Sequence, residues 1–191
     1  MMWLQKILSL LENLFYKRHQ ILLGKQETKI DPILLGAQVM NEYGSQITGF
    51  VRRDKTPDVT FSYSDKVDIA GAAGTQIFLN KEYFDKATNT EAKGILIHEV
   101  VHAIEQAEQG GEWWLIEALA DFVRLQLGYG KSEWVKDDPR TSGYGGGAYF
   151  FQWLYLNKYH IYVIVVDAMN EGLLLNNINQ MVDDYLLSSI D

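Results

Sequence analysis

The chain of 191 residues contains no cysteine. Disulfide scaffolds, catalysis by a thiol and zinc fingers with cysteine ligands are therefore excluded. The chain also lacks an excess of basic residues: 25 acidic residues against 17 lysines and arginines give a formal net charge of −8. Because it has neither a basic stripe nor a glycine-rich phosphate loop, we expect no nucleic-acid partner.

Long hydrophobic runs are missing too. The apolar stretch from Met1 to Tyr16 is interrupted by polar residues. It is too short for a membrane span and lacks the small-residue cleavage site of a signal peptide. Its leucines and isoleucines follow helical spacing. We predict an amphipathic helix within residues 1–30 that packs on the domain, in preference to one on a membrane surface.

Histidine is scarce, which makes its placement informative. Two of the four histidines, His98 and His102, bound the string H-E-V-V-H. Residues four apart lie on one face of a helix, so both imidazoles can bind one Zn²⁺. Glu99 is then beside the open coordination position, where it can take a proton from a zinc-activated water. The spacing predicts a zinc hydrolase with Glu99 as the general base.

A helix is predicted around this string. Thr88 and Glu91 have the spacing of a capping box, which satisfies free amides at a helix start. Apolar residues then recur near helical spacing up to Ile104, and Gly110-Gly111 indicates a stop. The histidines fall between apolar neighbours, which suits a site buried in a cleft.

Zinc needs a third protein ligand if water keeps the fourth position. Glu105 lies one turn beyond the histidines and should point along the helix, away from the metal. Glu108 has the place of the third ligand in metzincins, but the glycine that turns their chain out of the helix is absent. Glu117 lies in the strongly helical segment 113–124. A helix that returns toward the first would bring Glu117 to the histidines, so it is the preferred third ligand.

Asp121 lies one turn beyond Glu117 on the same face. It can accept the second N–H of a ligating histidine and so orient the ring. The alternative is that both acids are solvated charges on an amphipathic helix, but their apolar surroundings favour buried partners. A di-iron site is not supported, because it needs two E-x-x-H units and the chain has one, Glu99 to His102.

Three segments read HEVVHAIEQ, WWLIEALADFVRLQLGYG and SGYGGGAYFFQWL. Together they resemble the basic secretory protein family of zinc metallopeptidases, over a region from about Asp58 to about Lys158. The linked L-I-E-x-x-A-D-F-x-R-L is much more specific than the metal motif, which many zincins share. Ala118 and Phe122 depart from the glycine and tyrosine usual in the family, and neither is a proposed ligand.

The resemblance implies a gluzincin-type site in which His98, His102 and Glu117 bind zinc and Glu99 is the general base. It also implies a secreted or periplasmic protein, although we recognise no signal peptide in the chain. The sequence pI near 5.0 shows that the adjective in the family name does not apply here.

The predicted fold class is α+β. We expect a zincin-like metallopeptidase domain with a small sheet beside the active-site helix and a mostly helical C-terminal part. Asp31-Pro32 predicts the start of a helix before the sheet. The length and the 47% hydrophobic content indicate one domain over residues 1–191, with its metal-site core at 58–130 and a helical subdomain at 145–191.

Alternating side chains predict two short strands joined through a glycine-rich turn. The ranges are 58–64 and 75–80 for the strands and 71–74 for the turn. In zincins such a strand lies above the active-site helix and pairs with an extended substrate. Thr75, Ile77 and Leu79 are therefore candidates for substrate binding, the alternative being an ordinary internal strand.

A polar, glycine-rich segment from Gly130 to Gly147 predicts a loop that overhangs the cleft. Tyr144 within it is a candidate catalytic residue, because zinc peptidases often place a hydrogen-bond donor for the oxyanion opposite the metal. The alternative is an exposed loop tyrosine. The helices predicted after this loop are 148–159, 161–169 and 173–187.

These observations predict a zinc-dependent peptidase that acts on a peptide or protein substrate with Zn²⁺ as cofactor. The alternative is a non-catalytic binding domain with a structural or vestigial metal site. Glu99 argues against it, because a structural site has no use for a base and is normally closed by four protein ligands.

Overall fold

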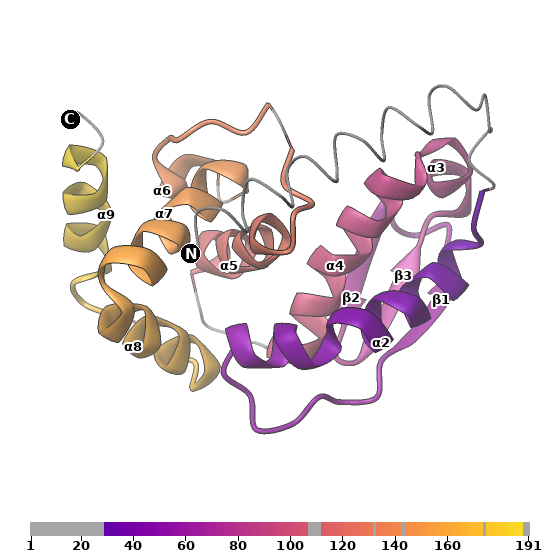
Figure 1. Ribbon diagram of the computed structural model, residues 1–191, viewed down its shortest axis with the longest axis horizontal. Coiled ribbons are helices and arrows are strands. Elements are labelled where there is room, and N and C mark those ends of the chain that lie inside the picture. The colour runs from indigo at the N-terminus through magenta and orange to yellow at the C-terminus, as the bar shows by residue number, and fades with distance from the viewer. Residues whose placement is uncertain (1–28, 107–111, 132, 143, 174, 189–191) are drawn as a thin grey trace, which may run out of the picture.

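The computed structural model describes residues 29–106, 112–131, 133–142, 144–173 and 175–188 (Figure 1). The helix predicted from Met1 to Tyr16 and the helix stop at Gly110-Gly111 lie outside the described residues. The fold is α+β, mostly helical with one small sheet, in agreement with the predicted class.

Helix α2, Pro32–Phe50, begins where the sequence predicts it. The Asp31 carboxylate accepts hydrogen bonds from the backbone amides of Ile33 and Leu34, at 2.9 and 3.3 Å. Pro32 takes the first helical position, where its missing amide hydrogen is not needed. This cap directs the buried stripe of α2 onto the next long helix.

The sheet has three strands: β1 (Thr60–Tyr63), β2 (Ala70–Ala73) and β3 (Gln76–Leu79). Their order is β1-β3-β2, with β1 parallel and β2 antiparallel to β3. The predicted turn at 71–74 therefore lies largely within a strand. Its small residues, which we took as signs of a turn, pair along the central strand instead.

The strand order corrects one prediction about the substrate. Residues 75–79 do not form an edge, because β3 is hydrogen-bonded to a neighbour on each side. Ile77 and Leu79 have fully buried side chains and Thr75 is half-buried, so the exposed edge expected at these residues is absent. Substrate binding by Thr75, Ile77 and Leu79 stays a prediction without that edge. The alternative that this is an internal strand holds.

Helix α3 (Lys81–Lys86) leads from the sheet to α4 (Asn89–Glu105). The Thr88 hydroxyl accepts a hydrogen bond from the Glu91 amide at 3.1 Å, as the predicted capping box requires. Helix α4 lies beside α2, and both pack against the sheet (Figure 1). Most of α4 is buried, since α5 covers it on a further side.

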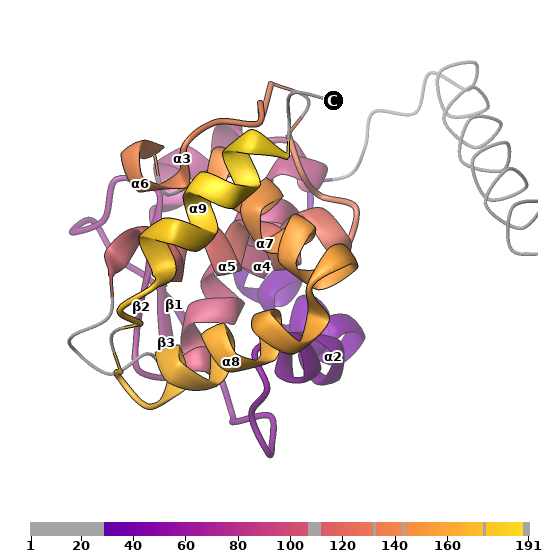
Figure 2. The ribbon, with the colours of Figure 1, turned by 90° about the vertical axis from the view of Figure 1, so that its left-hand side faces the viewer.

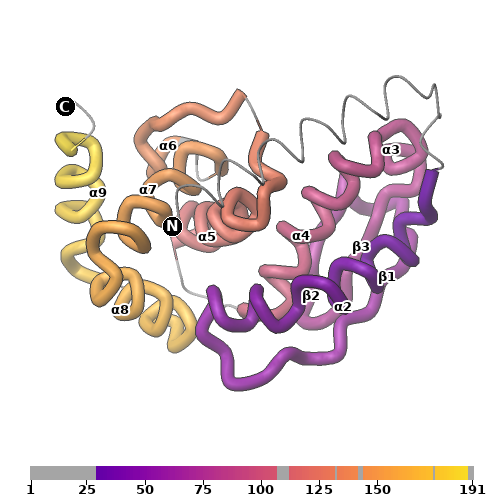
Figure 3. Tube along the Cα trace, in the orientation of Figure 1, coloured from indigo at the N-terminus to yellow at the C-terminus, as the bar shows by residue number. Residues whose placement is uncertain are grey.

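The remaining elements are all helical: α5 (Trp113–Gln126), α6 (Pro139–Ser142), α7 (Gly145–Asn157), α8 (Tyr159–Asn170) and α9 (Ile178–Leu187). Figure 3 shows this helical part beside the half that contains the sheet, and Figure 2 shows it in front of that half. Helix α5 joins the two parts, because it packs against α4 and α7. Within the part of the chain that the structure describes, no helix is both long and apolar enough to cross a membrane.

Helix α7 begins at Gly145, inside the segment predicted as a loop. The reason is a close helix contact that only glycine permits. A Cβ atom on Gly147 would lie 2.4 Å from the Ala118 Cβ on α5. The missing side chain lets α7 approach α5 closely, and the buried glycine run serves packing instead of a mobile overhang.

Candidate metal centre

The residues of the H-E-V-V-H string lie in the middle of α4, between the sheet and α5. His98 and Glu99 are each 8% exposed, and His102 is partly buried. The apolar residues between them point into the core, so the helix carries its polar side chains to the wall of a cavity. Histidine and glutamate in such surroundings need partners for their polar atoms.

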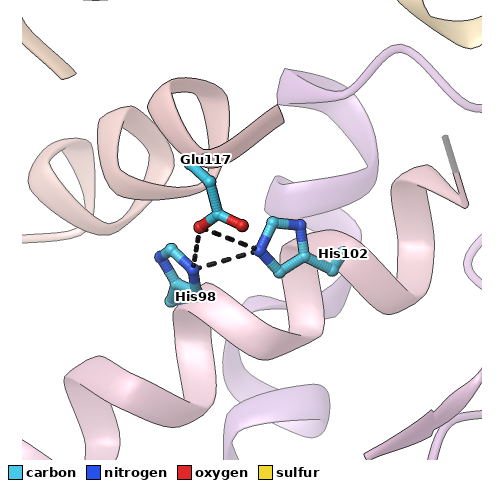
Figure 4. A group of neighbouring side chains, drawn as sticks. All are labelled: His98, His102 and Glu117. Carbon is cyan, nitrogen blue, oxygen red and sulfur yellow. Dashed lines mark hydrogen bonds and ion pairs between the residues drawn. The ribbon is translucent and has the colours of Figure 1, made fainter. Parts of the chain in front are cut away.

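Three side chains from two helices converge at this wall, as Figure 4 shows. The Nε2 atoms of His98 and His102 are 3.0 Å apart. Glu117 on α5 brings its Oε2 atom to 3.1 Å from Nε2 of His98 and 3.6 Å from Nε2 of His102. The helix spacing aligns the two histidines, and the packing of α5 on α4 adds the carboxylate.

Asp121, 2% exposed, lies one turn beyond the glutamate on α5. Its Oδ1 atom accepts a hydrogen bond from Nδ1 of His98 at 2.8 Å. This bond fixes the orientation of the ring and directs the other nitrogen toward Glu117 and His102. The structure thus brings Asp121 to the place predicted for it.

The electrostatics of these groups are strongly coupled. Burial by itself would lower the pKa of His98, but the hydrogen bonds to Asp121 and Glu117 outweigh it and raise this pKa to about 10. Burial would raise the pKa of Glu117, yet the hydrogen bonds to His102 and His98 lower it to about 2. Without a metal the carboxylate is therefore ionised and paired with a protonated imidazole, a charge arrangement that a divalent cation can replace.

The donor set fits a divalent cation. Two ligand atoms in a tetrahedral zinc site with bonds near 2.0–2.1 Å are roughly 3.3 Å apart. The three distances between the ligand atoms, from 3.0 to 3.6 Å, lie around that value. Two imidazoles and one carboxylate are also the donor set of catalytic zinc sites, which leave a fourth position for water.

A cavity of about 440 Å³ opens beside the three side chains. Glu99 lines it together with the histidines and Glu117. Residues of β2, an edge strand, also line it, including Ala70 and Ala72. Burial raises the pKa of the Glu99 carboxyl group, while the two histidines oppose this shift. A carboxyl group with a raised pKa holds a proton more readily than one in water.

Tyr144 lies at the same cavity, just before α7. Its ring stacks on that of His98, with the ring centroids 6.0 Å apart and the planes at 25°. The side chain is 50% exposed, and burial of its inner part together with the Glu117 charge raises the pKa of the hydroxyl group. The tyrosine is therefore close to the candidate metal ligands, and its hydroxyl group is protonated at neutral pH.

Two features of the cavity could not be predicted from the sequence. The first is the wall contributed by β2, because a run of alanine and glycine resembles a turn. The second is Glu105 at the end of α4, which also lines the cavity although its helical position turns it away from the three converging side chains. Glu108, the other candidate ligand, lies outside the described residues.

The family comparison covers most of the chain. One family model, whose members are described as peptidases of plants and bacteria, matches residues 17–187. No curated protein and no solved structure matches the chain. The matched region contains both helices of the candidate metal centre. The chain belongs to the basic secretory protein family of peptidases.

Proposed function

We propose that the chain is a zinc-dependent peptidase with a zincin-like catalytic domain. The observation that carries this proposal is the convergence of His98, His102 and Glu117, whose ligand atoms all lie within 4.8 Å of one another. The family membership supports the hydrolysis of peptide bonds. The two imidazoles and the carboxylate favour Zn²⁺ over the harder cations, which prefer oxygen ligands.

A zinc ion bound by these residues would supply Lewis acidity, which lowers the pKa of water and polarises a carbonyl group. Glu99 takes the proton from the attacking water and passes it to the leaving amine, so it acts first as base and then as acid. Its place next to His98 on α4, in the wall of the same cavity, supports this role.

Two further residues assist. Asp121 holds His98 in the orientation that directs Nε2 to the metal, and its 2.8 Å hydrogen bond supports this role. Tyr144 donates a hydrogen bond to the oxygen that becomes negatively charged in the transition state. Its raised pKa keeps that proton in place at neutral pH.

The peptide itself binds along β2. This strand pairs with β3 on one side, and in the described part of the chain its other edge faces no further strand. Ala70 and Ala72 line the cavity, and their small side chains leave room for a substrate backbone. An extended peptide can add to such an edge through main-chain hydrogen bonds.

The test compares the wild type with Glu99→Gln. We expect zinc content to be unchanged and cleavage of unfolded casein to fall by about 10²–10⁴-fold, the usual contribution of general acid–base catalysis. Elemental analysis and casein digestion with and without a chelator provide the measurements. Glu171→Gln, at an exposed position after α8, is the matched control and should alter neither quantity.

Two results would contradict the proposal in different ways. Wild-type protein that binds zinc but shows no chelator-sensitive cleavage would favour a non-catalytic binding domain. Undiminished cleavage by Glu99→Gln would leave the peptidase function in place and remove Glu99 from the role of general base.

A further inference from the structure

Glu105 combines two properties that ordinary packing does not explain. Its side chain is 0% exposed, and neither carboxyl oxygen has a hydrogen-bond partner. Among the described residues it is the only carboxyl group of this kind. An unpaired acid in such a place destabilises the fold, whereas a leucine or methionine would fill the same volume without that penalty.

The nearest cation does not form a hydrogen bond with the Glu105 carboxyl group. The Arg53 guanidinium donates hydrogen bonds to the backbone carbonyl groups of Glu105, with Nε at 2.8 Å, and of Gln106, and it leaves the Glu105 carboxyl group unbonded. Arg53 thus caps the C-terminal end of α4, where a cation is favoured by the helix dipole. Burial raises the pKa of Glu105 to about 8. The positive charge of Arg53 lowers this pKa, and the negative charge of Glu117 raises it further.

Glu105 lies close to the proposed substrate-binding site. It lies one helical turn beyond His102 and borders the cavity that holds His98, Glu99 and Glu117, although none of its own surface is exposed there. It is not one of the three side chains that converge as metal ligands. A substrate held at the metal therefore extends past Glu105 if it runs toward the C-terminal end of α4.

We propose that Glu105 determines substrate specificity by binding a cationic group of the peptide, an ammonium or a guanidinium, at this end of the cavity. The inference rests on the proposed peptidase function. The carboxyl group turns toward the cavity through its side-chain torsions and forms a charge-assisted hydrogen bond with the entering cation. The partner that the acid lacks inside the protein is thus supplied by the ligand. The cation belongs either to a lysine or arginine side chain or to a free amino terminus.

The experiment measures binding without turnover, on zinc-loaded Glu99→Gln protein. The probes are acetylated and amidated alanine–serine hexapeptides with one lysine at each position in turn, and the same set with norleucine. A third peptide, without lysine, is compared with and without its acetyl group. Titration calorimetry gives the dissociation constants.

We expect about tenfold or tighter binding for the cationic member of at least one pair, the range of a hydrogen bond to a charged group. If lysine at one position causes it, the cation is a side chain; if removal of the acetyl group causes it, the cation is the amino terminus. Glu105→Gln in the same background should reduce the preference to less than about twofold. Glu171→Gln should leave it unchanged.

Two outcomes would overturn the inference: no cationic preference in any pair, or a preference that persists in Glu105→Gln. Should the glutamine variant fail to fold, Glu105→Met removes the carboxyl group without leaving a polar group buried, and the same comparison applies. Casein cleavage by the wild type tests the peptidase function separately. A chain that cleaves casein but binds neutral and cationic peptides equally well would refute the role of Glu105 alone.

Discussion

The carboxyl groups at the two ends of the cavity differ in whether they have hydrogen-bond partners. At the end formed by α5, Glu117 and Asp121 both bond to imidazole nitrogens of α4. At the C-terminal end of α4, Glu105 is fully buried and its carboxyl oxygens have no hydrogen-bond partner. The paired acids hold the geometry of the candidate metal centre in the absence of a metal. The unpaired acid makes no bond that contributes to this geometry, and we propose that it binds a cation of the substrate.

Removing Glu117, the paired acid that is a proposed metal ligand, should produce the largest effect on zinc binding. Glu117→Ala leaves two histidines, and we expect zinc affinity to fall by more than the roughly 100-fold typical of losing an outer partner. Casein cleavage should disappear with the metal. Competition with a fluorescent zinc chelator measures the affinity, with Glu171→Ala as control. Near-normal affinity in Glu117→Ala would show that another group completes the site.

The next largest effect should follow from the paired acid that only orients a ligand. Asp121→Asn keeps the shape of the side chain but weakens its bond to Nδ1 of His98. We expect zinc affinity to fall about 10–100-fold. The exposed Asp58→Asn is the control in the same chelator competition. An unchanged affinity would mean that the packing of α4 alone orients the histidine.

A substitution that displaces α5 should change the end of the cavity that α5 forms and leave the end at the C-terminus of α4 unchanged. In Gly147→Ala the new methyl group meets Ala118, which follows Glu117 in the chain. We expect a loss of about 1–3 kcal/mol in the free energy of unfolding, typical of overpacking, with weaker zinc binding. Urea denaturation measures the first quantity. Gly49→Ala is a matched control, because a Cβ there meets no atom within 4 Å.

The smallest expected effect is a pH dependence at the unpaired end. The pKa of Glu105 is raised from 4.5 to about 8 in the folded state, so between these values folding takes up a proton. Stability from this group therefore falls as pH rises from about 5 to 8. Glu105→Gln should become more stable relative to the metal-free wild type over that window, by on the order of 1–3 kcal/mol.

Thermal unfolding at pH 5, 6, 7 and 8 checks this sign. Glu171→Gln should track the wild type at every pH. A stability difference between Glu105→Gln and the wild type that is constant with pH would show that the carboxyl group finds a partner when it ionises. Glu117 has the opposite sign: its pKa is lowered, so its contribution to stability is lost as pH falls.

Local rules explain why much of this protein could be predicted from its sequence. The N-cap at Thr88 and the spacing of His98 and His102 depend on helix geometry alone, and both occur in the structure as predicted. The second bond of the predicted capping box is replaced, because the Glu91 carboxylate accepts a hydrogen bond from the Tyr83 hydroxyl group. Glu117 and Asp121, four residues apart on one predicted helix, also reach the expected positions. The roles of these side chains in catalysis stay predictions.

Tertiary structure decided everything that depends on distant pairing. Strand order is one case: β3 lies in the centre of the sheet and β2 at an edge, because hydrogen bonds between strands depend on partners that no local pattern specifies. The start of α7 within a glycine-rich segment is another, since only contact with Ala118 makes missing side chains favourable in a helix. The burial of Glu105 is the third. The spacing in the sequence predicts that Glu105 turns away from the histidines. Only the packed fold leaves its carboxyl group without a partner, because burial depends on neighbours that the whole chain brings together.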